Sequence, residues 1–114
     1  MPVDRMQWGA EAWQFADLHM PDEPSPFQND HGVPCIMLIH GGFWKKQYTY
    51  ELMQPIANAL SDAGVASWNI EFRRWEDGDE GVWMDTLSDV LRAWGQLALL
   101  PGIAQCKCSL LLHY

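Results

Sequence analysis

The stretch Leu-Ile-His-Gly-Gly-Phe-Trp-Lys, residues 38–45, decides how the rest of this chain can fold. It closes a continuously apolar run, Cys35–Ile39, that lies between Pro34 and Gly41. A short apolar run without alternation is typical of a strand covered on both faces, as in parallel sheets. We therefore expect a buried strand over 35–39 that ends at a glycine pair followed by two bulky aromatic residues.

The next two elements follow from hydrophobic spacing. Apolar residues recur at helical spacing over 52–63, and Gly64 follows where a helix end favours a left-handed residue. Pro55 fits the first turn of that helix, after a short turn over 49–54. Apolar and polar residues alternate over 65–73, which predicts a second strand with one apolar face.

A polar loop over 75–81 precedes the clearest periodic signal in the chain, a predicted helix over 83–98 that Pro101-Gly102 ends. Another apolar run, Cys108–Leu112, predicts a third strand. The apolar face expected on the helix consists of Trp83, Leu87, Val90, Leu91, Trp94, Leu97 and Ala98.

The order strand, helix, strand, helix, strand predicts an α/β fold of three layers, αβα, with a mostly parallel sheet and right-handed crossovers. We expect one domain over 1–114. Residues 1–34 would form an N-terminal strand and loop region, with a strand or hairpin over 8–20 and a proline-rich loop over 21–34. Residues 35–114 would form the βαβαβ core.

Charge and composition exclude several classes of function. Seven basic and fifteen acidic residues give a net charge of −8, which argues against partners such as nucleic acid and anionic membranes. Three cysteines, an odd number, indicate no disulfide framework, so we expect a cytoplasmic protein. The sequence shows no signal-peptide core and no apolar run near the roughly 20 residues that span a bilayer.

The glycine pair lies where open α/β sheets bind ligands, beyond the carboxyl end of a strand. Successive N–H groups freed there can point at an anion, as in an oxyanion hole. The alternative is an ordinary turn from a strand into a helix. A dinucleotide loop is disfavoured because G-x-G-x-x-G is absent and aromatic residues occupy the turn.

Three blocks of sequence carry a resemblance to a known family. They are residues 38–44, residues 51–55 (Glu-Leu-Met-Gln-Pro) and residues 68–74 (Trp-Asn-Ile-Glu-Phe-Arg-Arg), with weaker matches at 8–9, 14–18 and 87–90. With these blocks the chain resembles the α/β-hydrolase superfamily, in particular its esterase, lipase and arylformamidase-like branch. The resemblance covers about residues 8–113 and implies the N-terminal half of the α/β-hydrolase fold.

The resemblance also implies roles for the residues after the first strand. Gly41, Gly42 and Phe43 would offer the N–H groups of an oxyanion hole. His40 would brace that loop, and Trp44 would pack beside it. The substrate would be a small-molecule ester or amide, and no cofactor or metal is implied.

Two charged residues after the second strand complete the implied site. Glu71 and Arg73 resemble the polar pair of the family, which would form an internal salt bridge that supports the site. The alternative for both side chains is that they are simply solvated charges.

The resemblance stops where the family has its nucleophile. In the family the third strand leads into G-x-S-x-G, whereas here Leu112 takes the place of the first glycine and Tyr114 that of the serine. No serine of the chain has a glycine two residues before it, and the acid and histidine of a triad are also absent. We therefore predict no catalytic residue and no hydrolysis by this chain.

Other interpretations of the ending stay open. The chain can be a truncated product, a non-catalytic module that pairs through its C-terminal edge strand with a partner or a second copy, or the result of a changed reading frame.

The remaining chemical groups predict no site. Cys106 and Cys108 share one face of a strand but His113 falls on the other, which disfavours a metal site. The acidic residues at 77, 79 and 80 predict a solvated loop, with Trp75 and Trp83 in the core. His19 and His31 are expected to be exposed and inert.

Overall fold

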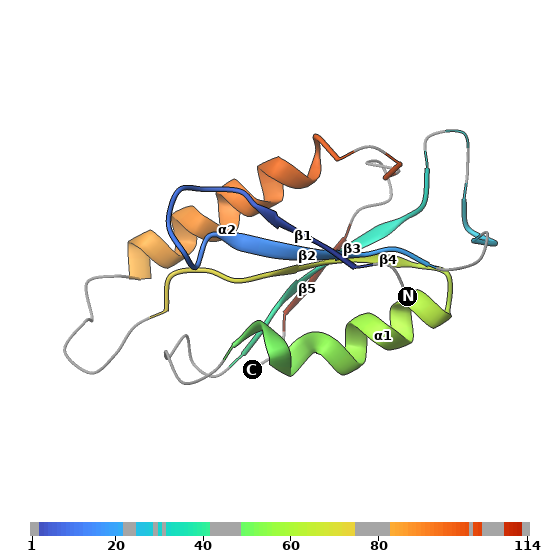
Figure 1. Cartoon of the computed structure of the whole chain (residues 1–114), viewed down its shortest axis with the longest axis horizontal. Helices are drawn as coiled ribbons and strands as arrows, with labels where there is room; N and C mark the ends of the chain where they lie inside the picture. The colour runs from blue at the N-terminus through green and yellow to red at the C-terminus, as the bar shows by residue number, and fades with distance from the viewer. Residues whose placement is uncertain are drawn as a thin grey trace.

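The computed structural model describes residues 3–21, 25–28, 30, 32–41, 49–74, 83–100, 102–103 and 109–112, of which 83 and 109–112 are described by their backbone alone. Within these residues one five-stranded sheet has a helix on each face (Figure 1). The predicted three-layer α/β class is therefore confirmed. No helix in the described part of the chain is long and apolar enough to cross a membrane.

The sheet is mixed, with the strand order β1-β2-β4-β3-β5. Strand β3 pairs in parallel with both β4 and β5, as the order of the elements predicts. The N-terminal segment is a hairpin, and both of its strands run antiparallel to their neighbours. The strand bounds are β1 (Val3–Gln7), β2 (Phe15–His19), β3 (Cys35–Ile39), β4 (Ala66–Ile70) and β5 (Ser109–Leu112).

The helices α1 and α2 lie on opposite faces of the sheet (Figure 1). Thr49 begins the 3-10 turn η1, where its side chain accepts a hydrogen bond from a main-chain N–H two residues on. Pro55 lies in the first turn of α1, and Gly64 follows that helix with a φ of 91°, both as predicted. The bounds are η1 (Tyr50–Met53), α1 (Gln54–Asp62) and α2 (Trp83–Leu97).

The larger apolar cluster lies between the sheet and α2. The indole of Trp68 is fully buried there, and its Nε1–H donates to the carbonyl of Ala93 in α2 at 3.0 Å. The alternation predicted for the second strand is confirmed, because Ala66, Trp68, Ile70 and Phe72 all belong to this cluster.

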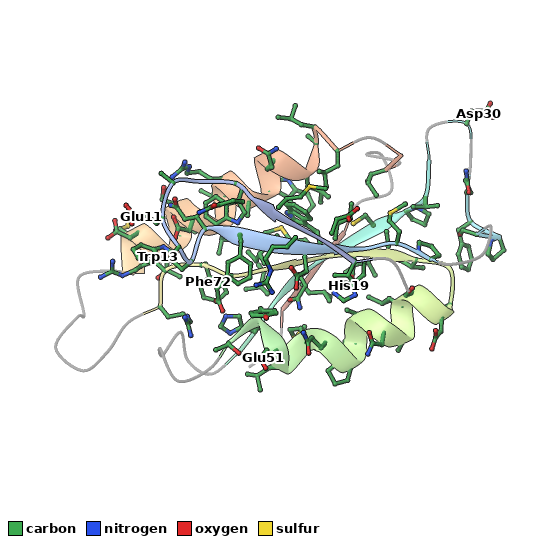
Figure 2. All side chains as sticks on the ribbon, viewed as in Figure 1. Glu11, Trp13, His19, Asp30, Glu51 and Phe72 are labelled. Atoms are coloured by element: carbon green, nitrogen blue, oxygen red, sulfur yellow. The ribbon has the colours of Figure 1, made fainter. Side chains whose placement is uncertain are left out.

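The face of the sheet that α1 covers is buried but carries many polar side chains. A small apolar cluster of Leu38, Met53 and Ala57 lies there, beside buried polar residues of β2 and β4. The expectation that His19 is exposed is wrong, because β2 carries its ring into the space beneath α1 (Figure 2). This burial lowers the pKa of His19, and the nearby Asp17 opposes the shift.

The prediction of which residues form the apolar face of the second helix is wrong in part. Leu87, Leu91 and Trp94 are exposed by 46%, 61% and 40%, whereas Ala93 and Leu97 are buried against the sheet. The small side chain of Ala93 is selected because the indole of Trp68 fills the space beneath it. The helix is therefore rotated about its axis relative to the prediction.

Candidate functional site

The candidate site lies where three parallel strands end together. The last residue of β3 is opposite the last residues of both β4 and β5. The chain passes from β3 to β4 on one side and then crosses to β5 on the other side of β3. Such a reversal of direction opens a crevice at the carboxyl ends of the strands, and His40 and Gly41 follow β3 at this point.

The carboxylate of Glu71 joins the ends of β3 and β4 to η1. It is only 3% exposed. Its Oε1 lies 2.6 Å from Nε2 of His40 and accepts the N–H of Phe72 at 3.1 Å. Its Oε2 accepts the N–H of Tyr50 at 3.1 Å. Both oxygens are therefore used, and the side chain is fixed in one orientation.

His40 is held on three sides. Its Nε2 faces the Glu71 carboxylate, and its Nδ1 lies 3.0 Å from the carbonyl oxygen of Gly41. The imidazole stacks on the ring of Phe72 with centroids 4.4 Å apart and planes 15° apart. Both polar partners are hydrogen-bond acceptors. These contacts fix the backbone where β3 gives way to the glycine pair.

The predicted salt bridge of Glu71 with Arg73 is wrong, because the guanidinium that approaches Glu71 is that of the next residue. Nε of Arg74 lies 3.4 Å from Oε1 of Glu71. The Arg73 guanidinium lies over the ring of Trp13 at 5.1 Å from its centroid. Residues 71–74 follow the end of β4 at Ile70, and the alternation that would place Arg73 on the side of Glu71 does not continue through them.

No role for Asp89 was predicted, although residues 87–90 are among the weaker matches to the family. This buried carboxylate accepts Nε1–H of Trp13 at 3.0 Å, Nε2–H of Gln14 at 3.0 Å and the main-chain N–H of Arg73 at 2.8 Å. It thus ties α2 to the β1–β2 connection and to the segment after β4. A buried acid on the sheet-facing side of a helix is detectable only once the helix rotation is known.

Several predicted residues fall outside the described part of the chain. Of the three expected oxyanion-hole residues, Gly41 is described and buried, while Gly42 and Phe43 lie outside. Trp44 also lies outside, as do the acidic loop residues at 77, 79 and 80, His31, Trp75, Cys106, Cys108, His113 and Tyr114, together with the side chain of Trp83.

The described part of the site holds the backbone at the end of β3 in place. Among its residues there is no nucleophile paired with a base. No serine hydroxyl among the described side chains is hydrogen-bonded to a histidine ring: that of Ser61, for example, donates to the carbonyl of Met20. The described residues also include no group of three or more acidic, histidine or cysteine side chains able to hold a metal ion.

Solved structures similar to the chain include esterases and an α/β-hydrolase enzyme. Esterase 2 of Thermogutta terrifontis matches with a TM-score of 0.74 and 14% identity, over 96% of this chain and 39% of that protein. A bacterial heroin esterase matches with a TM-score of 0.72 and 20% identity, over 96% and 34%. An α/β-hydrolase enzyme from a Medee basin deep-sea metagenome matches with 0.72 and 16%, over 96% and 45%.

No family model and no curated protein sequence matches the chain. The chain spans about two-fifths of the length of the first of these esterases. The similarity covers nearly all of this chain at low identity, so it concerns the arrangement of strands and helices. The chain has the fold of the N-terminal portion of an α/β hydrolase.

Proposed function

We propose that this chain carries the oxyanion-hole segment of a serine-type hydrolase of carboxylic esters or amides. The observation that carries the proposal is the brace of Glu71 and His40, which fixes Gly41 at the carboxyl end of β3. Oxyanion holes work by preorganisation, since their N–H donors must be aimed before charge develops on the substrate. The neighbouring solved structures, which include an esterase and a putative thioesterase, support the same class of substrate.

The N–H donors of the proposed hole are those of Gly41, Gly42 and Phe43. Glycines suit this place because a substrate oxygen must approach the main chain closely. Trp44 would support the turn from beside it. The register of the sheet also matters to the proposal. Because β5 ends opposite the end of β3, the residues after β5 would lie near the same end of the sheet.

We further propose that the 114 residues alone do not hydrolyse esters. The position of the nucleophile in the motif is occupied by Tyr114, and no G-x-S-x-G occurs in the sequence. Loss of the nucleophile from a serine hydrolase lowers turnover by about 10⁶-fold. An intact oxyanion segment cannot compensate for a loss of that size.

A fluorophosphonate probe tests this proposal, because it reacts covalently with an activated nucleophile held beside an oxyanion hole. We expect no labelling of the purified chain and no hydrolysis of p-nitrophenyl acetate above the buffer rate. Stoichiometric labelling would show that a nucleophile is present. The coding DNA after the Tyr114 codon tests the family assignment: we expect one reading frame to encode Ser-Ala-Gly-Gly and later Asp and His, and their absence from all three frames would contradict it.

A second function is favoured by the place of β5, which is the outermost of the described strands on its side of the sheet. An edge strand presents unpaired main-chain N–H and C=O groups and can pair with another chain. The chain would then be a non-catalytic interaction module that pairs through β5. A soluble monomer at all concentrations, measured by light scattering, would contradict this second function.

A further inference from the structure

A polar cavity of about 210 Å³ lies between the β1–β2 connection, the segment after β4 and the first three turns of α2. Its lining includes Gln14 and Asp89, which are both buried and are hydrogen-bonded to each other at 3.0 Å. Trp13, which Figure 2 labels, lies beside them, and its Nε1–H donates to the same carboxylate. None of the lining residues belongs to the brace of Glu71 and His40. The cavity is therefore distinct from the candidate oxyanion segment.

Two arginine side chains line this cavity and have no polar partner among the described residues. The guanidinium of the half-buried Arg73 lies over the ring of Trp13, at 5.1 Å from its centroid. The guanidinium of the exposed Arg92 lies over the ring of Trp8, at 5.6 Å. Contact with an aromatic face orients a guanidinium but uses none of its five N–H donors. The cavity therefore presents two oriented cations that can donate to a ligand.

The two acidic residues of the cavity limit the charge of that ligand. The carboxylate of Asp89 already accepts three hydrogen bonds from protein donors. Asp85 is exposed, and its carboxylate has no hydrogen bond or ion pair with another described residue. Since these two carboxylates offset the charge of the two guanidiniums, the cavity has no excess positive charge with which to hold a dianion. A ligand with a single negative charge placed at the arginines fits it better.

We propose that this cavity binds a small organic carboxylate. The N–H groups of Arg73 and Arg92 would donate to its oxygens, because the fork of a guanidinium matches a carboxylate in spacing and direction. Side chains of a helix lean toward its N-terminus, so Arg92 extends back toward Ser88, whose hydroxyl also lines the cavity and can donate. The volume is below the roughly 300–1,000 Å³ of pockets that hold drug-sized ligands, which limits the ligand to a small one.

Two-dimensional ¹H–¹⁵N NMR of the full chain tests the site, with the indole N–H of Trp13 as the reporter because it donates to Asp89 in the cavity. Sodium acetate is titrated in exchange for sodium chloride at constant ionic strength. We expect a saturable shift of the Trp13 signal with a Kd of about 1–10 mM. Phosphate at about pH 7.5, where it is largely a dianion, should bind at least about fivefold more weakly. No saturable shift up to about 100 mM acetate would overturn the inference.

Arg73→Gln and Arg92→Gln should each raise the Kd for acetate at least about fivefold, because each removes charge-assisted donors. The matched control is Arg5→Gln, which removes a guanidinium that donates to Tyr50 of η1 and does not line the cavity; it should leave the Kd unchanged. Asp85→Asn should lower the Kd about two- to threefold, because it removes a like charge.

The dispersion of each NMR spectrum shows whether the variant is folded, and either arginine variant serves if the other is not. Unchanged affinity in the folded arginine variants would overturn the site. Tighter binding of phosphate than of acetate would overturn the carboxylate as its ligand, and weaker binding of acetate by Asp85→Asn would overturn the charge balance that selects a single negative charge.

Discussion

Replacing Glu71 by glutamine tests whether this carboxylate holds the candidate site together. Its Oε1 serves His40, the Phe72 N–H and Arg74, while its Oε2 accepts the N–H of Tyr50. An amide has one acceptor oxygen, so either orientation of glutamine points an NH₂ group at a buried donor. An unsatisfied buried donor costs about 1–3 kcal/mol, and the remaining bonds lose their charge assistance. We expect Glu71→Gln to lower the free energy of unfolding by about 2–4 kcal/mol.

Urea denaturation followed by tryptophan fluorescence measures this change, since Trp68 is buried in the core. The midpoint should fall by about 1–2 M for an m-value of about 2 kcal/mol/M. The control is Glu51→Gln, which makes the same exchange on an exposed residue of η1 and should change stability by less than about 0.5 kcal/mol. Equal effects of the two substitutions would refute the reasoning, because the loss would then reflect charge alone.

Three other predictions concern the frame around the site. Burial lowers the pKa of His19, so the unfolded chain binds a proton more readily than the folded chain does. The free energy of unfolding should therefore fall as the pH drops below about 6.5. His19→Leu should flatten the dependence of the urea midpoint on pH between pH 8 and pH 5. Gly64→Ala should cost about 1–2 kcal/mol, because φ is 91° and the new Cβ would lie 2.9 Å from Cδ of Pro26; an unchanged melting temperature would contradict this. The Arg5 guanidinium donates two hydrogen bonds, of 2.8 and 3.1 Å, to the carboxylate of Asp17. Arg5→Lys keeps the charge but cannot make both bonds, and it should lower the free energy of unfolding in urea by about 0.5–1 kcal/mol. Arg5→Met should lower it further.

The strands of the parallel core could be predicted from the sequence because their signals are local. The run at 35–39 has no polar residue, and the run at 65–73 alternates strictly, so each strand is recognisable by itself. The helix end at Gly64 has an equally local signal, because a positive φ after a helix favours glycine. The hairpin strand β1 was placed too late, because Val3–Gln7 is largely exposed and carries no apolar pattern.

The rotation of α2 could not be predicted because it depends on what the helix meets. Hydrophobicity alone assigns Leu87, Leu91 and Trp94 to the sheet. The structure instead buries Ala93 against the indole of Trp68. It also buries Asp89, whose carboxylate accepts three hydrogen bonds. A buried acid with complete hydrogen bonding costs little, so polarity was a poor guide to this face.

The candidate site divides in the same way into a local and a non-local part. The glycine pair after β3 is visible in the sequence, whereas its brace joins His40 to a carboxylate 31 residues later. Glu71 also accepts a hydrogen bond from the N–H of Tyr50 in η1. The same carboxylate therefore anchors the described residues on both sides of the segment 42–48. A preorganised oxyanion segment requires such fixed ends, and it requires them whether or not a nucleophile is present. The stability of Glu71 variants therefore reports on the frame of the site separately from its chemistry.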